Sequence, residues 1–150
     1  VRTFSKSRQL AGARLGYAFA NAELISDLNR IKFSFNPYNV NRLTAIAGAK
    51  AVEDSGYFEN CKAKVIATRN VLMQGLKQLG FSLTSSMANF VFAKHPKISG
   101  NRYYEALKEK GILVRHFSAE RVNEYVRITV GTDEEIEALL AATAEILQEV

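Results

Sequence analysis

The chain has 150 residues, of which 47% are hydrophobic and 23% charged, and its formal net charge is +5. This composition is typical of a folded globular protein and excludes a disordered or fibrous one. The apolar runs are shorter than the roughly 20 residues that a membrane span needs, and the N-terminus lacks a signal-peptide pattern. The 20 basic residues are scattered along the chain, which argues against nucleic acid and favours small anions as partners.

Cys61 is the only cysteine of the chain. An intramolecular disulfide is therefore impossible, and a cysteine-based zinc site is disfavoured, so we expect no metal site. A single thiol fits a reducing compartment, and we expect a cytoplasmic protein.

The first third of the chain predicts two strands followed by two helices. The apolar stretches VRTF (residues 1–4) and LGYAFA (15–20) are typical of short buried strands. Asn21 is a suitable N-cap for the sequence AELISDLNRIK, in which apolar residues recur at helical spacing. The turn formers of FSFNPYNVN end this helix, and a second helix is expected over residues 41–53.

The remaining residues predict a small α/β domain. A long helix is expected over residues 57–79, with Gly80 as its stop, and a shorter one over 101–110. Strands are predicted at 89–94, 112–115 and 124–130, and a capping box at Thr132 to Glu135 opens a last helix. We therefore expect residues 1–54 to be part of one unit and 55–150 to form a domain with a largely antiparallel sheet.

Lys6 and Arg14 are the candidate functional pair in the N-terminal segment. Lys6 is expected at the end of a strand, where sites in α/β sheets form, and a lysine acts as a nucleophile only as the neutral amine. The turn around Gly12 lets the segment fold back, so both side chains could address one ligand. An amine together with a guanidinium that binds a phosphate through two hydrogen bonds suits a cofactor with an aldehyde and a phosphate. The alternative is that Lys6 is a solvated surface charge, as most lysines are.

The string TFSKSRQLAGARLGYA (residues 3–18) resembles the active-site segment of the fold-type-I aminotransferases that use pyridoxal 5'-phosphate, in the branch that contains histidinol-phosphate aminotransferase. The resemblance implies that Lys6 holds the cofactor and acts as general base and acid. It also implies that Ser5 and Arg14 bind the cofactor phosphate. Gln9 departs from the pattern, because a small residue is commoner at that position.

The same resemblance implies the fold and the assembly. Residues 1–54 would be the C-terminal part of the large cofactor-binding domain, and residues 55–150 the small C-terminal domain of an α/β protein. In relatives, the acidic partner of the pyridine nitrogen and the aromatic residue that covers the ring precede the position of Val1. We therefore expect no activity for this chain alone. For the intact protein, the resemblance implies a homodimer.

Two later segments, ILVRHF and EYVRITVGT, resemble the arginine-bearing strands of the small domain in this branch. The resemblance assigns Arg127 to an anionic group of the substrate, Arg115 to the phosphate of histidinol phosphate, and Asn89 to a position near the substrate. The second substrate pair would be glutamate and 2-oxoglutarate. Without the resemblance, Arg127 is interpreted as a solvated strand arginine and Asn89 as a cap or strand-edge residue.

Three further residues have simpler interpretations. His116 is interpreted as a loop or surface histidine rather than as an acid or base. Tyr38 and Asn39 match a loop that lies near the dimer partner's site in relatives, and a turn explains them equally well.

Two alternative functions stay open on the sequence alone. The first is another enzyme of the same fold, either an aromatic-amino-acid aminotransferase or a phosphothreonine decarboxylase. The second is a non-catalytic α/β module that binds anions or a partner chain. The first alternative keeps Lys6 and Arg14 in their roles, whereas the second gives Lys6 no cofactor.

Overall fold

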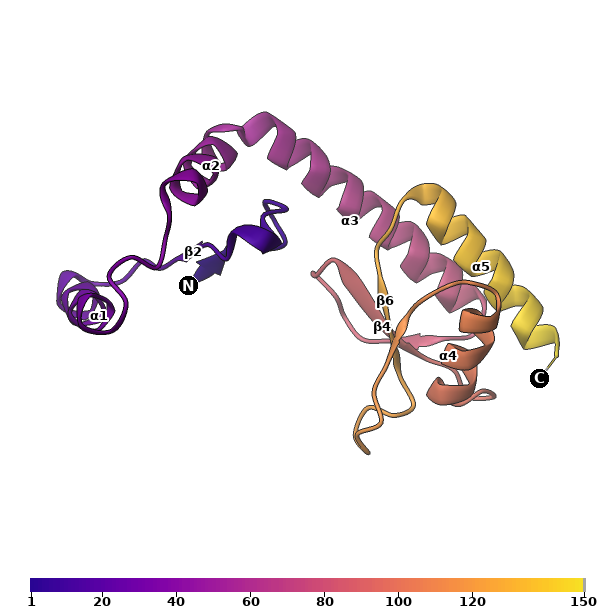
Figure 1. Cartoon of the computed structure of the whole chain (residues 1–150). Helices are drawn as coiled ribbons and strands as arrows, with labels where there is room; N and C mark the ends of the chain where they lie inside the picture. The colour runs from indigo at the N-terminus through magenta and orange to yellow at the C-terminus, as the bar shows by residue number, and fades with distance from the viewer. Residues whose placement is uncertain (150) are drawn as a thin grey trace. The chain divides into compact units, whose positions relative to one another are not determined.

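The boundary between the two units of the fold lies inside a helix, between Lys62 and Ala63. A computed structural model of the chain describes residues 1–149 (Figure 1). Helices and two antiparallel sheets make up these residues, which confirms the predicted α/β class. The assignment of residues 1–54 and 55–150 to a large and a small domain stays a prediction. No helix within residues 1–149 combines the length and hydropathy needed to cross a membrane.

The first unit contains a two-stranded ribbon and helices. Its elements are β1 (Arg2–Thr3), the short 3-10 helix η1 (Ala11–Ala13), β2 (Gly16–Tyr17), α1 (Ala22–Phe35), α2 (Arg42–Glu53) and the start of α3 (Ser55–Gln78). The strands pair antiparallel, with Thr3 opposite Gly16. The segment between them therefore folds back on itself.

The prediction of buried strands over residues 1–4 and 15–20 is wrong in both length and burial. Each strand has two residues, and all of them are exposed. Only Phe4 is buried, and its ring meets the Tyr17 ring edge-on at 5.5 Å between centroids. The reason is that, within residues 1–149, these strands pair only with each other, and a two-stranded ribbon buries little surface.

The two helices predicted after the ribbon are confirmed, and so is the predicted cap at Asn21, while Asn41 caps the second helix instead of starting it. The Oδ1 atom of Asn21 accepts a hydrogen bond from the Leu24 amide at 2.9 Å, and Asn41 does the same for Thr44 at 2.8 Å. Each cap satisfies an amide that the first helical turn leaves without a partner. In α2, a Cβ atom at the buried Gly48 would run into the Leu15 side chain, so glycine lets this helix approach the ribbon.

The second unit is a four-stranded antiparallel sheet with helices. Its elements are the rest of α3, β3 (Ser82–Leu83), β4 (Phe90–Lys94), α4 (Gly100–Glu109), β5 (Arg115–His116), β6 (Val126–Thr129) and α5 (Asp133–Gln148). The strand order is β3-β4-β6-β5. The strand predicted at 112–115 begins later than expected and covers only two residues. Gly80 follows α3 as predicted and has a positive φ, and Gly111, also at positive φ, follows α4.

The core of this unit lies between one face of the sheet and the three helices. Val91 of β4 and Val126 and Ile128 of β6 are buried against residues such as Leu72 and Leu107 of the helices. Side chains alternate between the two faces of a strand, so Phe92, Arg115 and Arg127 lie on the other face. Figure 1 shows α4 beside the labelled strands β4 and β6.

A buried hydrogen bond joins α4 to α5 inside this core. The Tyr103 hydroxyl lies 2.7 Å from Oγ1 of Thr143, and Thr143 donates to the Leu139 carbonyl at 2.6 Å. Since the Thr143 proton is already used, Tyr103 is the donor of the bond between them. Burial raises the pKa of Tyr103 to about 12.

We predict that Tyr103→Phe changes stability with opposite signs at neutral and alkaline pH. Near pH 7 the variant loses one buried hydrogen bond and should be less stable by about 1 kcal/mol. An unfolded tyrosine ionises near pH 10 but the folded one only near pH 12, so the unchanged protein loses roughly 3 kcal/mol across that window. Urea unfolding measured by circular dichroism should show the two stability curves crossing above pH 10, and parallel curves would contradict this assignment.

The loop between β1 and β2 holds two non-glycine residues in the left-handed region. Gln9 has φ of 57° and Arg14 has φ of 52°. For a residue with a Cβ atom this conformation costs about 1 kcal/mol or more. The Gln9 side chain accepts one hydrogen bond, from the Tyr57 hydroxyl at 3.2 Å, on the surface.

We predict that Gln9→Gly stabilises the protein by about 1 kcal/mol, because glycine adopts positive φ without strain. Gln9→Ala is the matched control, since it removes the same side-chain hydrogen bond but keeps the Cβ atom. Thermal unfolding should give a higher midpoint for the glycine variant only. An equal gain for the alanine variant would show that backbone strain is not the cause.

Candidate active site

Residues 5–14 form a loop that backbone hydrogen bonds close at its base. The Phe4 amide donates to the Leu15 carbonyl at 3.0 Å, and the Leu10 amide donates to the Phe4 carbonyl at 3.1 Å. Lys6 and Arg14 therefore belong to one closed loop, which we call the Lys6 loop. The expected folding back of this segment is confirmed, whereas the roles of its side chains stay predictions.

Hydroxyl groups gather at the start of the Lys6 loop. The Thr3 hydroxyl lies 2.9 Å from the Ser5 hydroxyl and donates to it, and the Ser5 amide donates to Thr3 Oγ1 at 3.1 Å. Ser7 donates its hydroxyl to the Thr3 carbonyl at 3.4 Å. Within residues 1–149 the Ser5 proton has no acceptor, so it is available for an incoming anion.

The charge of this segment is entirely positive. The first 22 residues include Arg2, Lys6, Arg8 and Arg14 and no acidic residue. In the described part of the chain, Lys6 and Arg14 form no ion pair, and Arg14 donates only to the Ala11 carbonyl of its own loop, at 3.3 Å. A cluster of cations without carboxylates favours an anionic ligand.

Arg8 anchors the loop, and sequence reasoning missed it. Its guanidinium lies 3.8 Å from the centroid of the Phe58 ring of α3, and its Nη1 atom donates to the Ala51 carbonyl of α2 at 2.7 Å. The loop is thereby fixed to α2 and to the first turns of α3. No local pattern signals this contact, because Ala51 lies 43 residues further along the chain.

Arg115 and Arg127 lie directly opposite each other on β5 and β6. Like charges in this position repel, and no salt bridge offsets the repulsion for either residue among those described. The Nε atom of Arg127 is buried and has no hydrogen-bond partner within residues 1–149. An anion bound between the two guanidinium groups would offset their repulsion and would give the Arg127 Nε atom a hydrogen-bond acceptor.

Aromatic rings lie beside these arginines and were also missed from the sequence. The guanidinium carbons of Arg115 and Arg127 lie 5.4 and 5.8 Å from the centroid of the Phe117 ring. Arg127 also lies 5.5 Å from the centroid of the Phe90 ring. The available signal was the spacing of two between Arg115 and Phe117, which places both on one side of an extended chain.

Asn89 immediately precedes β4 and is exposed. Its carbonyl accepts a hydrogen bond from the Val130 amide at 2.9 Å, which continues the pairing of β4 with β6. The preceding residue is also held, because Arg69 of α3 donates to the Ala88 carbonyl at 2.8 Å. The backbone at Asn89 is therefore fixed from both sides, while its side chain has no partner among the described residues.

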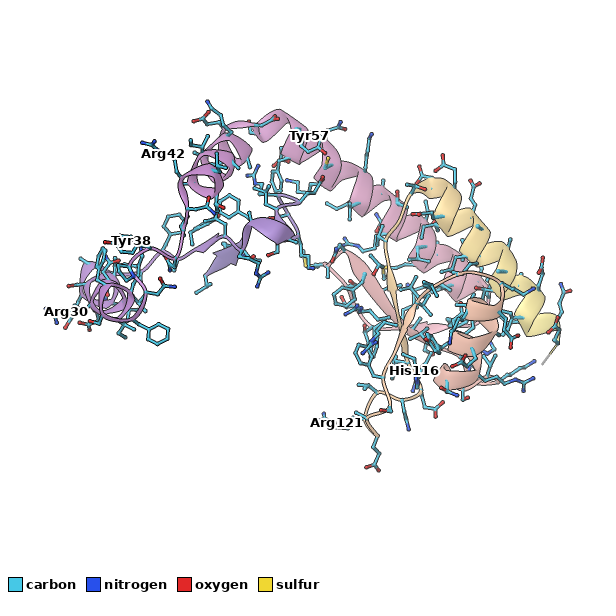
Figure 2. All side chains as sticks on the ribbon, in the orientation of Figure 1. Arg30, Tyr38, Arg42, Tyr57, His116 and Arg121 are labelled. Carbon is cyan, nitrogen blue, oxygen red and sulfur yellow. The ribbon has the colours of Figure 1, made fainter. Side chains whose placement is uncertain are left out.

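His116 lies in β5 and not in a loop, so that interpretation is corrected. It is half-buried, and its Nε2 atom lies 2.7 Å from the Asn123 carbonyl, to which it donates. Its ring stacks on that of Tyr104 at 6.1 Å between centroids, and Figure 2 labels it beside α4. The ring is therefore held by the Asn123 backbone and by Tyr104.

Tyr38 and Asn39 lie in the loop between α1 and α2, where Figure 2 labels Tyr38. Both are exposed, and 91% of the Tyr38 residue is accessible to solvent. The candidate residues thus fall into two groups: Ser5, Lys6, Arg14, Tyr38 and Asn39 belong to the first unit, and Asn89, Arg115, His116 and Arg127 to the second. Within residues 1–149, no three His, Cys, Asp or Glu side chains are placed to hold a metal ion.

The relatives found by comparison belong to the branch that the string at residues 3–18 resembles. The histidinol-phosphate aminotransferase of Brachyspira hyodysenteriae is 50% identical over 137 residues, which are 91% of this chain and 39% of that protein. That of Chromohalobacter salexigens is 46% identical over 93% of this chain and 40% of its own length. The chain thus spans about 40% of the curated relatives it matches.

A solved structure and a family model support the same conclusion. The histidinol-phosphate aminotransferase of Sinorhizobium meliloti in complex with pyridoxal 5'-phosphate has a TM-score of 0.81 and 27% identity, covering 99% of this chain and 40% of that one. The model of aminotransferase class I and II matches residues 1–142. The resemblance noted at residues 3–18 is confirmed, and the chain belongs to the class I and II aminotransferase family.

Proposed function

We propose that the intact enzyme exchanges an amino group between histidinol phosphate and 2-oxoglutarate, with glutamate as the second amine. The observation that carries this proposal is the cross-strand pair Arg115 and Arg127, which has no carboxylate partner among the described residues. One substrate carries a phosphate and the other carries two carboxylates. Guanidinium groups bind both kinds of anion with paired hydrogen bonds, so two arginines suit the two half-reactions.

The residues of the Lys6 loop fit pyridoxal 5'-phosphate by the chemistry of their donors. Lys6 offers a primary amine to the aldehyde, while the Ser5 hydroxyl and the Arg14 guanidinium offer protons to the phosphate. When bound, this cofactor supplies an electron sink for negative charge at the substrate carbon. The left-handed backbone of Arg14 supports this role, because such strain is commonly retained at functional sites.

Lys6 would then move the proton of the reaction. Its Nζ atom, as a neutral amine, would accept the proton from the substrate carbon that bears the amino group and would then donate it to a second carbon, the one that entered as the cofactor aldehyde, so that the proton shifts between the two carbons. The loop geometry supports this, because two backbone hydrogen bonds and the Arg8 contacts limit how far the backbone around Lys6 can move. A base held in place raises the rate by avoiding the cost of orientation in each cycle.

The two arginines and Asn89 would hold the substrates. We assign Arg115 to the phosphate of histidinol phosphate, Arg127 to a carboxylate, and Asn89 to a position near the substrate. The buried Nε atom of Arg127 supports its assignment, since a carboxylate oxygen would give that atom the partner it lacks within residues 1–149.

We further propose that residues 1–54 end the large domain, that 55–150 form the small domain, and that the intact protein is a cytoplasmic homodimer. The exposed loop with Tyr38 and Asn39 supports the dimer, because an exposed tyrosine suits a protein interface. The relatives' greater length supports the expectation that this chain alone does not sustain turnover.

Lys6 can be tested by chemical labelling of the intact enzyme. Borohydride treatment with pyridoxal 5'-phosphate should leave a pyridoxyl group on Lys6, found by peptide mass spectrometry. Lys6→Ala should lose the label and turnover, with a fall in kcat of about 10² or more if the base is lost. Lys50→Ala is the matched control, because Lys50 only pairs with Glu53 on the surface, at 2.6 Å. A Lys6→Ala enzyme that keeps turnover would remove Lys6 from the mechanism.

The substrate assignment can be tested with Arg115→Lys. A lysine keeps the charge but cannot fork a phosphate, and we expect KM for histidinol phosphate to rise about tenfold or more, consistent with a charge-assisted hydrogen bond. KM for 2-oxoglutarate should change less. Steady-state kinetics with histidinol phosphate, phenylalanine and phosphothreonine complete the test. Preferred turnover of either of the last two would replace the proposed substrate.

A further inference from the structure

A single aromatic ring lies against both arginines of the second unit. The Phe117 ring is 5.4 Å from the guanidinium of Arg115 and 5.8 Å from that of Arg127, measured to the ring centroid. Phe117 follows β5 directly, and the two arginines are cross-strand neighbours on β5 and β6. The two like charges therefore share one ring.

The two arginines do not depend on this ring equally. Among residues 1–149, Arg127 has a second ring, that of Phe90, at 5.5 Å from its guanidinium carbon, whereas Arg115 has Phe117 alone. Neither has a carboxylate within salt-bridge distance in residues 1–149. Within residues 1–149, the Phe117 ring is thus the only attractive contact of the Arg115 guanidinium.

The Phe117 ring is itself held by neighbouring aromatic side chains. Its centroid lies 6.4 Å from that of Phe92 of β4, with the rings nearly perpendicular at 66°. Phe92 in turn stacks on Tyr125 at 4.6 Å, with the planes 10° apart. This row of rings crosses the face of the sheet that carries the arginines, so Phe117 has neighbours that restrict its motion.

An aromatic ring beside a guanidinium can orient it without using the N–H groups that bind an anion. A carboxylate partner would orient an arginine, but it would also occupy the N–H groups that the substrate anion needs. An aromatic face attracts the cation and leaves the N–H edge available. It also offsets part of the repulsion between two arginines directly opposite each other.

We propose that Phe117 is a positioning residue that orients Arg115, and to a lesser degree Arg127, for the anionic groups of the substrates. Phe90 does the same for Arg127 alone. This inference rests on the proposed function for the identity of the substrates. It goes beyond that function because it makes an apolar residue set the affinity for the phosphate.

The test uses the intact enzyme with Phe117→Leu, Phe117→Tyr and Phe90→Leu. Loss of one cation–π contact should raise KM for histidinol phosphate about fivefold in Phe117→Leu, with kcat nearly unchanged. Phe117→Tyr keeps a ring and should remain within about twofold of the unchanged enzyme. Phe90→Leu is the matched control, and it should raise KM for 2-oxoglutarate but not for histidinol phosphate.

A double-mutant cycle separates positioning from packing. In an Arg115→Leu background there is no guanidinium to orient, so Phe117→Leu should raise KM no further. An equal increase in both backgrounds, or a tyrosine variant as poor as the leucine variant, would overturn the inference. Thermal unfolding of each variant identifies any that fail to fold, in which case Phe117→Tyr against Phe117→Met replaces the pair.

A substrate-independent measurement distinguishes this inference from the proposed function. Inorganic phosphate should protect Arg115 from phenylglyoxal, as read by peptide mass spectrometry, and Phe117→Leu should need about fivefold more phosphate for the same protection. If histidinol phosphate is not a substrate but this shift is seen, the proposed function fails and the role of Phe117 stands. Equal protection in both proteins would refute the role of Phe117 whatever the substrate is.

Discussion

The alternation of side chains along β4 and β6 is the constraint on which the second unit depends. Val126 and Ile128 point into the core, so the residue between them, Arg127, must lie on the other face. The register between β5 and β6 then places Arg115 directly opposite Arg127. A shift of one residue in either strand would bury an arginine among Leu72, Leu107 and their neighbours, so the hydrophobic core that sets the register also sets the spacing of the two guanidinium groups.

Features governed by local rules could be predicted from the sequence. The cap at Asn21 and the capping box of Thr132 with Glu135 depend on residues within four positions of one another, and both are present. The alternation of EYVRITV was enough to place Arg127 outside the core. The motif around Lys6 was enough to predict the aminotransferase family, because residues 3–18 are contiguous in the sequence.

Features that depend on distant pairing could not be predicted. The contacts of Arg8 with Ala51 and Phe58 join residues far apart in sequence, and nothing near Arg8 indicates them. The shared ring of Phe117 required the register of β5 with β6, which the sequence does not state. The apolar character of residues 15–20 predicted burial, but burial depends on a second layer, and in residues 1–149 that stretch pairs only with β1.

The hydrogen bond between Arg8 and the Ala51 carbonyl limits where residues can be added to or deleted from α2. Ala51 lies near the end of α2, and its carbonyl accepts from Arg8 at 2.7 Å. Adding or deleting one residue within the helix before Ala51 would turn that carbonyl by about 100° around the helix axis and away from Arg8. Residues of α2 that follow Ala51 are free of this constraint, because their number does not change the direction of the Ala51 carbonyl.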